Sequence, residues 1–515
     1  MDGLGFSFVA SRRNGSSQKK PEQTWNRIAI IMEFYRNAIH PLRLLEDRYV
    51  EIAFLGANRQ VTGSRHLLKT GTRNIMVDCG MFQERDFIGR NWEPCPVPAR
   101  EVDDVLITHA HLDHCGLLPK LVKEGFDGGI HSTEASAELI EIILRDSAKI
   151  QSEDLAYKMK RHRKEGRKGK YPPSLLYDIQ DVENTLPLIR GVPCGGSVAL
   201  GEDTVATFHE GGHILGAAMI SVDVQREGRR ARVIFSGDIG QKDRPIVRDP
   251  TLCTRADYVV IESTYGDRVH DNHEKVEDQL ADIVNEAVDR GGSVVMPVFA
   301  VERSQDLIYH FGRLMHRKRI PRIPVYLDSP MAAKATEVFR RHHECYDDET
   351  QAMLAAGQDP FRFPELVLSR TTDESKAINR AKPPVVIMST SGMCTAGRIK
   401  HHLAHHITKK ESTIVFCGYQ AHGTLGRLIL EGNEEIRIHG RYLPVKARIR
   451  QINGVSGHAD RKGLLAWLAG FSTKPKKVFV VHGEAGSANH FAELVRRELK
   501  LDAVVPEYGE TIRLE

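Results

Sequence analysis

From Val50 onward, short runs of apolar and β-branched residues alternate with turn residues. The runs EIAFLG, NIMVDCG and DDVLITHAH are of this kind, and such runs bounded by glycine or aspartate predict β-strands. Between residues 133 and 165 the pattern becomes that of a helix, for which Ser132 or Thr133 is a suitable cap. The first part of the chain therefore predicts a sheet laid down strand by strand, followed by a long helix.

After Asp238, helical and strand-like segments alternate in the manner of a parallel α/β unit. Examples are VEDQLADIVNEAVDR, SVVMPVF, ERSQDLIYHFGRLMHRKR and IPVYLDS, and this alternation predicts a parallel sheet covered by helices. Short strands return from about Glu435, followed by a helix near residues 461–470 and the strand KVFVVHGE. The order is therefore sheet, α/β insert and sheet again.

Domain boundaries follow from this order. We predict the first part of one domain over residues 50–265, an insert over residues 266–435, and a return to the first domain over residues 436–515. Residues 1–49 are polar and rich in turn residues, which predicts a poorly structured N-terminal extension. An alternative is that the true start of the protein lies near Val50.

Length and charge agree with this division. A chain of 515 residues is too long for one ordinary core, so two domains or one domain with a large insertion are expected. Lys and Arg number 72 against 68 Asp and Glu, a net charge of +4, which permits a polyanionic partner without requiring one. Between Lys158 and Lys170 eight residues are Lys or Arg and one is Glu, and a solvated surface is the favoured interpretation of that segment.

Cysteine usage and apolar runs indicate the cellular compartment. The eight cysteines lie far apart with no C-x-x-C pair, which favours reduced thiols over a disulfide framework or a zinc ribbon. No apolar run approaches the length of a membrane span, and the N-terminal region does not resemble a secretory signal. We therefore expect a cytoplasmic protein with no membrane partner.

The segment VLITHAHLDHCG concentrates candidate metal ligands at the end of an apolar run. It contains His109, His111, Asp113 and His114, and imidazole nitrogens and carboxylate oxygens are zinc ligands. If the backbone stays extended, His109, His111 and Asp113 share one side of the strand while His114 faces the other. One loop could then supply two neighbouring metal ions.

Three further polar residues stand where other apolar runs end. They are His213 in FHEGGHILGAA, Asp238 in ARVIFSGDIG and His482 in KKVFVVHGEAG. Each alone has an ordinary explanation as a turn or cap residue. Because all of them follow β-runs, the edge of a sheet sandwich would gather them, and together they predict a metal centre.

These motifs resemble those of a known family. THAHLDHCG matches the H-x-H-x-D-H signature of the metallo-β-lactamase fold, and NIMVDCGMFQ, GGHILGAA and FSGDIG resemble its other motifs in the right order. VVIESTYGDR, VSGHADRKG and VVHGEAG resemble motifs A, B and C of the β-CASP nucleases. The resemblance extends from Val50 to the C-terminus and implies an α/β fold, an αββα metallo-β-lactamase sandwich with an inserted α/β β-CASP domain.

The resemblance also assigns roles to individual residues. It implies two Zn²⁺ ions, the first bound by His109, His111 and His213, the second by Asp113, His114 and His482, with Asp238 as the bridge. Asp78 would support the ligand loop without binding metal. Glu262 matches motif A and His458 matches motif B, a pair expected to hydrogen-bond at the mouth of the site.

The implied activity is hydrolysis of phosphodiester bonds in single-stranded RNA. A metal pair activates water and offsets charge on a phosphate, and His458, oriented by Glu262, would protonate or bind the leaving oxygen. A purely structural or phosphate-binding His458 is the alternative.

The length of the insert bears on the substrate. The 244 positions from Asp238 to His482 leave room for a lid over a long polymer, and a slot of that kind favours single strands. Family members that act on DNA tend to lack a histidine at motif C, so His482 favours RNA.

Two turn-rich loops of the insert are candidates for RNA binding. Their backbone N–H groups, hydroxyls and arginines suit a nucleic-acid backbone, although ordinary turn chemistry with surface arginines explains them too. The candidate residues are Ser389, Ser391, Gly392, Arg398, Gly423, Thr424 and Arg427.

Several functions remain open on the sequence alone. An endoribonuclease acting in RNA processing or decay is the first choice, and 3' exoribonuclease activity is possible in addition. The rivals are a small-ester or thioester hydrolase on the same metal centre and a noncatalytic RNA-processing scaffold. Family analogy also permits a homodimer through the C-terminal region.

Overall fold

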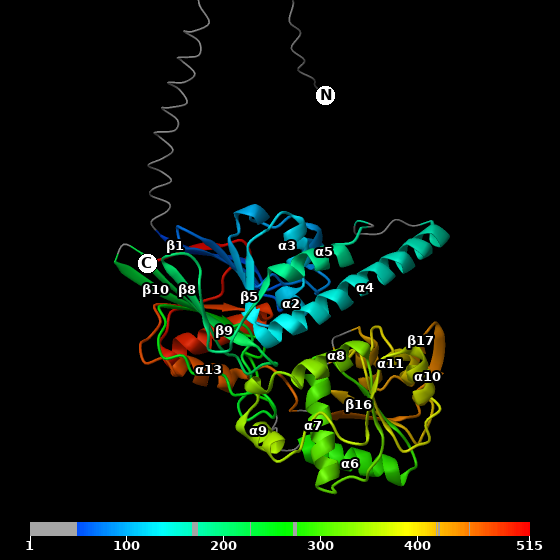
Figure 1. Cartoon of the computed structure of the whole chain (residues 1–515). Coiled ribbons are helices and arrows are strands. Elements are labelled where there is room, and N and C mark those ends of the chain that lie inside the picture. The colour runs from blue at the N-terminus through cyan, green and yellow to red at the C-terminus, as the bar shows by residue number, and fades with distance from the viewer. Residues whose placement is uncertain are drawn as a thin grey trace, which may run out of the picture. The chain divides into compact units, whose positions relative to one another are not determined.

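The structure is a computed structural model, and it describes residues 49–166, 172, 174–226, 228–270, 276–418, 420, 423–452 and 454–515. The chain divides into two units, residues 1–49 and residues 50–515. The predicted N-terminal extension lies outside the described residues except for Tyr49. The fold described below is that of the second unit (Figure 1).

Two seven-stranded sheets form the first domain, in the orders β22-β1-β2-β3-β4-β5-β6 and β21-β20-β11-β10-β9-β8-β7. The first sheet contains β1 (Val50–Gly56), β2 (Arg65–Lys69), β3 (Asn74–Val77), β4 (Asp104–Leu106), β5 (Gly129–Thr133), β6 (Ile189–Val192) and β22 (Thr511–Leu514). The second contains β7 (Ser197–Ala199), β8 (Thr204–Glu210), β9 (Ala218–Arg226), β10 (Arg229–Phe235), β11 (Tyr258–Glu262), β20 (Lys477–Val481) and β21 (Ala503–Val504).

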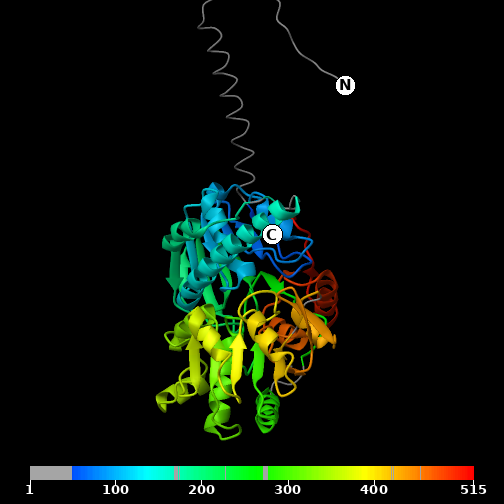
Figure 2. The same ribbon diagram turned by 90° about the vertical axis from the view of Figure 1, so that its right-hand side faces the viewer.

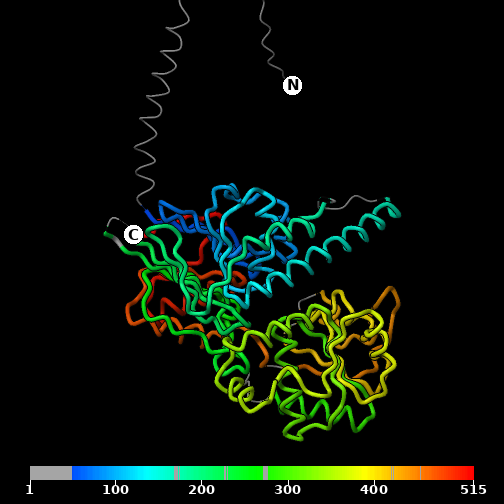
Figure 3. Tube along the Cα trace, viewed as in Figure 1, coloured from blue at the N-terminus to red at the C-terminus, as the bar shows by residue number. Residues whose placement is uncertain are grey.

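The two sheets pack face to face through a shared apolar core. Phe54 of β1 and Phe479 of β20 are buried there with ring centroids 5.1 Å apart. The outer face of the first sheet is covered by α2 (Leu112–Cys115), α3 (Leu118–Lys123), α4 (Glu134–Glu165) and α5 (Ile179–Thr185), and that of the second by α13 (Arg461–Ala469) and α14 (Ala485–Leu494). The predicted αββα sandwich is confirmed (Figures 1 and 3).

The insert is a separate six-stranded sheet in the order β14-β13-β15-β12-β16-β19, parallel throughout. Its strands are β12 (Val294–Pro297), β13 (Val325–Asp328), β14 (Leu366–Ser369), β15 (Val386–Ser389), β16 (Thr413–Cys417) and β19 (Arg448–Ile452). Its helices are α6 (Val276–Asp289), α7 (Arg303–His316), α8 (Pro330–Phe339), α9 (Asp348–Ala355), α10 (Thr372–Ile378), α11 (Ile399–His406) and α12 (Leu425–Leu430). Figure 2 shows this insert, coloured green to orange, as a body distinct from the sandwich.

The predicted end of the insert between residues 435 and 436 is wrong. The hairpin of β17 (Glu435–Ile438) and β18 (Arg441–Pro444) forms its own two-stranded sheet, and β19 then pairs with β16 over five residues. The insert's sheet therefore extends to Ile452. The strand itself was predictable, but its partner was not, because parallel pairing joins segments that are distant in sequence.

The long predicted helix is confirmed as α4, capped by the Thr133 side chain, which accepts a hydrogen bond from the Ser136 N–H. The first half of α4 is buried against the sandwich, and its second half, from Lys149 onward, is largely exposed. Within the described part of the chain, no helix is both long enough and apolar enough to cross a membrane.

Candidate metal centre

The ligand loop follows β4 and changes conformation halfway along. Ile107 remains extended, since its N–H donates to the carbonyl of His131 at 2.8 Å. The helical turn α2 then begins at Leu112. Asp113 and His114 therefore lie on a helical turn, and the predicted strand-like alternation, with Asp113 on the side of His109, is wrong. A polar residue after a short strand can start either conformation, so the pattern alone does not decide.

A glycine allows the turn to pack against the neighbouring chain. The Asp113 carbonyl accepts a hydrogen bond from the Ser64 N–H at 2.8 Å, and a Cβ atom on Gly80 would lie 1.6 Å from that carbonyl oxygen. Only glycine fits at such a close backbone approach. The glycine of NIMVDCG therefore shapes the ligand loop through its lack of a side chain.

The first ligand group brings together residues from three loops. The ligand atoms of His109, His111, His213 and Asp238 all lie within 4.8 Å of one another. His111 Nδ1 is 3.0 Å from His109 Nε2 and 3.3 Å from His213 Nε2. His109 is completely buried, and its ring faces this group.

The second group contains Asp113, His114 and His482 within the same limit. His114 Nε2 and His482 Nε2 are 3.0 Å apart, and His482 Nε2 is 3.6 Å from Asp113 Oδ2. The two nitrogen atoms that meet here come from positions 368 residues apart. The sequence predicted that His482, at the end of a distant β-run, joins this group, and the geometry agrees.

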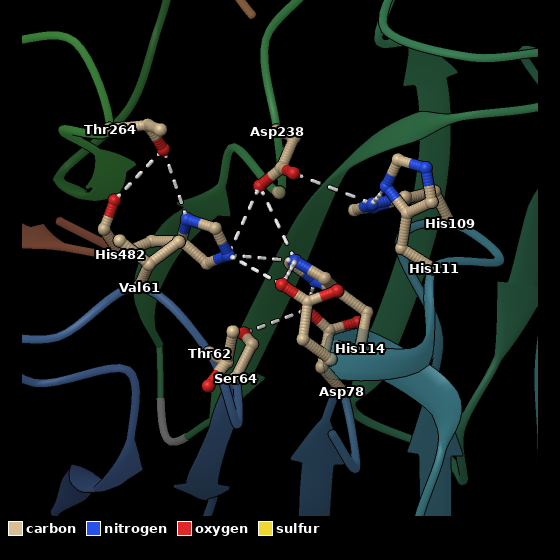
Figure 4. Close-up of polar contacts among 12 residues, drawn as sticks. Val61, Thr62, Ser64, Asp78, His109, His111, His114, Asp238, Thr264 and His482 are labelled. Carbon is tan, nitrogen blue, oxygen red and sulfur yellow. Dashed lines mark hydrogen bonds and ion pairs between the residues drawn. The ribbon is translucent and has the colours of Figure 1, made fainter. Parts of the chain in front are cut away.

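Asp238 lies between the two groups and turns one oxygen to each (Figure 4). Its Oδ2 is 3.5 Å from both His109 Nε2 and His213 Nε2. Its Oδ1 is 3.4 Å from His114 Nε2 and 3.6 Å from His482 Nε2. This is the arrangement expected of a carboxylate that bridges two ions.

The donor set fits divalent metal ions. In a tetrahedral zinc site with bonds of about 2.0–2.1 Å, two imidazole nitrogens lie about 3.3 Å apart, close to the spacings found here. Asp238 Oδ1 is buried without a hydrogen-bond partner, which is costly unless another group satisfies it. Burial holds the pKa values of His109 and His213 well below the ordinary range, and neutral imidazole is the form that binds metal.

Supporting residues fix the orientation of two ligand rings. Asp78 Oδ2 lies 2.7 Å from His114 Nδ1, and Asp78 Oδ1 accepts the Thr108 N–H at 2.9 Å. Thr264 Oγ1 is 3.1 Å from His482 Nδ1. In both rings the Nε2 atom is therefore directed at the ligand group, as expected when a polar neighbour holds the other nitrogen. Asp78 was predicted for this position, whereas Thr108 and Thr264 carried no sequence signal.

His458 and Glu262 form the predicted pair. His458 Nδ1 is 3.1 Å from Glu262 Oε2 and 3.7 Å from Asp238 Oδ2. Glu262 is completely buried and also accepts the Ile239 N–H at 2.7 Å. Although Glu262 lies close enough to Asp238 and His482 to count among possible ligands, these bonds occupy its oxygens and favour a positioning role.

A buried charge cluster that the sequence did not reveal ties the insert to the His213 loop. Arg244 Nη1 donates to the His213 carbonyl at 3.1 Å, and Arg244 Nη2 contacts Asp306 of α7 at 2.7 Å and Glu302 at 3.4 Å. Glu302 in turn accepts the Leu215 N–H at 3.3 Å. Burial, with Asp306 adding to it, raises the pKa of Glu302 to about 8. The residue that precedes α7, Glu302, is therefore hydrogen-bonded directly to the backbone of the loop that carries the candidate ligand His213.

The first candidate RNA loop is largely held from within the insert. Ser389 is completely buried, and its hydroxyl donates to the Asp328 carbonyl at 2.9 Å. Arg398 Nη1 donates to the Asp328 carboxylate at 2.8 Å. Ser391 accepts the Thr395 N–H at 3.2 Å. Ser389 and Arg398 thus stabilise the loop, while a contact of this loop with RNA remains a prediction.

The second candidate loop meets the first. The Gly426 N–H donates to the Met393 carbonyl at 3.3 Å, and Gln420 Nε2 donates to the Gly392 carbonyl at 3.1 Å. The remaining predicted residues are Gly423 with a φ of 78°, Thr424, which caps α12, and Arg427, which contacts Glu431 at 2.8 Å. The first loop follows β15 and the second follows β16, two parallel strands that both pair with β12. The structure therefore brings the two loops together at one edge of the insert's sheet.

Comparison with known proteins agrees with this architecture. Residues 62–290 match the metallo-beta-lactamase superfamily, residues 304–429 the Beta-Casp domain, and residues 442–506 the Zn-dependent metallo-hydrolase RNA specificity domain. Ribonuclease TTHA0252 of Thermus thermophilus is 38% identical over 435 residues, which cover 84% of this chain and 93% of that protein. The chain belongs to the β-CASP family of the metallo-β-lactamase superfamily.

A second relative and one solved structure are less similar in sequence to this chain. Transcription termination factor FttA of Methanocaldococcus jannaschii is 32% identical over 483 residues, covering 91% of this chain and 72% of that protein. A crystal structure of a protein of unknown function from Enterococcus faecalis shares the fold with a TM-score of 0.51, at 12% identity, over 90% of this chain and 100% of that one. The resemblance that the motifs indicated is thereby confirmed.

Proposed function

We propose that this β-CASP protein is a zinc-dependent ribonuclease that hydrolyses phosphodiester bonds within single-stranded RNA. The observation that carries the proposal is the convergence of two ligand groups on the two oxygens of Asp238. The Thermus relative is named a ribonuclease, and residues 442–506 match an RNA specificity domain; both support RNA as the substrate.

The ligand groups suit two ions. The first would be held by His109, His111 and His213, the second by Asp113, His114 and His482, with Asp238 between them. Bound there, two divalent ions lower the pKa of water and offset the negative charge that a phosphodiester develops during in-line displacement. Zinc is favoured because imidazole and carboxylate ligands in this number suit it.

His458 is the group of this chain best placed to move a proton. Burial alone lowers its pKa, but the carboxylates of Glu262 and Asp238 outweigh burial and raise it to about 9, so the ring is protonated at neutral pH in the metal-free protein. Since Glu262 holds Nδ1, Nε2 remains to donate to the leaving oxygen or to a phosphate oxygen.

The insert loops would then position the RNA backbone. Ser391, Gly392, Gly423 and Thr424 lie in turns whose N–H and hydroxyl groups suit phosphate oxygens, and Arg427 adds a cation beside them. The mutual contact of the two loops supports a single binding surface. The buried Ser389 and the ion-paired Arg398 would not contact RNA themselves but would hold the first loop in the conformation that binds it.

Cleavage of end-labelled RNA tests the proposal. Zinc-loaded protein is incubated with a single-stranded RNA labelled at the 5' end and, separately, with the same RNA labelled at the 3' end. Labelled fragments of intermediate length are expected with either label, because a cut within the chain leaves each labelled end on a shortened RNA. Release of labelled mononucleotides alone would replace the endonuclease proposal by exonuclease activity, and intact RNA would reject the ribonuclease proposal. Light scattering on the same protein tests the further proposal of a homodimer.

A further inference from the structure

A large cavity lies beside the metal centre, between α4 and the segment that follows β3. It has a volume of about 1480 Å³, and its walls include Phe82 and Trp92 from that segment, Leu155 and Met159 from α4, and Leu112 from the ligand loop. Typical small-ligand pockets have volumes of about 300–1000 Å³. This cavity is larger and has room for more than one flat ring system.

The face of α4 toward this cavity is regular. Gln151, Asp154, Leu155, Lys158 and His162 line it, and their spacing places them on one side of a helix with about 100° per residue. In this outer half of α4, Gln151, Leu155 and His162 are the half-buried positions, while the residues around them are exposed. The helix therefore forms one wall of the cavity.

Charge on the walls favours an anionic occupant. Of the charged residues that line the cavity, Lys158, Arg161 and Arg163 are cationic and Asp154 is acidic. Arg161 has a loose ion pair with Glu165, at 4.0 Å between exposed side chains, and such a pair contributes little. Aromatic and aliphatic walls with a cationic rim are the features by which proteins bind single-stranded nucleic acid.

Two residues of the cavity wall adjoin the site proposed for catalysis. Leu112 stands between His111 and Asp113 in the chain, and its carbonyl accepts the Met81 N–H at 3.0 Å. Thr395, whose N–H donates to Ser391 of the first insert loop, also lines the cavity. The cavity therefore borders both the ligand loop and the first insert loop.

We propose that this space, the α4 cavity, binds unpaired nucleotides of the RNA next to the cut, with a base against the half-buried Trp92 and phosphates against Lys158 and Arg161. The inference rests on the proposed ribonuclease function and makes it more specific. Bases can enter only if they are unpaired, so the cavity selects single strands and requires a substrate that extends beyond the cut.

Binding of RNA to metal-free full-length protein tests the α4 cavity independently of cleavage. The probe is a fluorescein-labelled oligouridine of twelve nucleotides, followed by fluorescence anisotropy at several salt concentrations. The test variant is Lys158→Glu/Arg161→Glu. Its matched control is Lys160→Glu/Lys164→Glu, which makes the same charge change on the same helix at positions that do not line the cavity.

The test variant should bind at least about tenfold more weakly, whereas the control should lose less than about threefold. Loss of two phosphate contacts should also flatten the plot of log affinity against log salt by about 1.4, at about 0.7 for each contact with a single strand. Trp92→Leu should weaken binding about tenfold, because one base loses its stacking partner. The dependence of affinity on salt should stay unchanged, because no charge is removed.

Equal losses from the two double variants would overturn the proposal, because diffuse charge along α4 would then explain the binding. Unchanged affinity in all three variants would also overturn it and would indicate another occupant, such as an apolar peptide. If zinc-loaded wild-type protein leaves RNA intact while the expected differences persist, the ribonuclease proposal fails and the assignment of the cavity to RNA is supported.

Discussion

Replacing Arg244 with methionine should both destabilise the protein and slow cleavage. The Arg244 side chain is 4% exposed and contacts the His213 carbonyl, Glu302 and Asp306. Methionine fills much of the same volume but leaves the Asp306 carboxylate without its closest cation. The His213 carbonyl also loses its donor, so a loop that carries a metal ligand becomes free to shift.

The size of the effect follows from burial. Removing one partner of a buried, hydrogen-bonded ion pair costs about 3–5 kcal/mol. The folded unit spans residues 50–515, and at about 2.1 cal/mol/K per residue its unfolding entropy is about 1 kcal/mol/K. The Tm should therefore fall by about 3–5 °C. A displacement of His213 by a fraction of an ångström to 1 Å should lower kcat about tenfold to a hundredfold.

Differential scanning calorimetry and RNA cleavage measure the two effects, with Arg248→Met as the control. Arg248 is exposed and donates to the Tyr346 carbonyl at 3.0 Å, so its replacement should shift the Tm by less than about 1 °C, as most surface changes do. If Arg244→Met and Arg248→Met behave alike in both assays, the cluster does not couple the insert to the ligand loop.

Further predictions concern metal content, pH and protonation. Plasma mass spectrometry should find two zinc ions per wild-type chain and about one in His213→Ala or in His482→Ala, and a wild-type content of one ion would reject the two-group assignment. The raised pKa of Glu302, about 8, gives stability that is present at low pH and lost as pH rises toward 8. Urea unfolding of Glu302→Gln should therefore show a smaller loss of stability than wild type between about pH 5 and pH 8; parallel curves would contradict this. NMR titration of the metal-free protein should place the pKa of His458 near 9 and find it lower in Glu262→Gln, and an unchanged value would remove Glu262 as its cause.

The sequence carried enough information to predict that the candidate metal ligands cluster, because these residues follow strands. His109, His213, Asp238 and His482 all come within three residues of the end of a β-run, and parallel strands end at one edge of a sheet. The local pattern of a polar residue after a β-run therefore implied that residues distant in sequence cluster in space. The resemblance to β-CASP motifs then indicated how the ligands divide, which the two-residue strand period alone assigned wrongly for Asp113.

Other features were out of reach because they depend on tertiary contacts. Arg244 and Glu302 are ordinary charged residues until folding buries them against each other. Thr264 looks like any turn threonine in VVIESTYGDR, yet it holds His482. The pairing of β19 with β16 joins residues 413–417 with 448–452, and no local pattern distinguishes that partner from the strands of the sandwich.

The role of the metal ligands can be tested most directly by comparing cleavage of a single-stranded RNA by zinc-loaded wild-type protein and by His109→Ala. The buried His109 ring faces the first ligand group and Asp238. Loss of metal-ion stabilisation worth several kcal/mol should slow cleavage at least about a thousandfold, while RNA affinity stays within about threefold of wild type. Cleavage by His109→Ala at the wild-type rate would contradict the account.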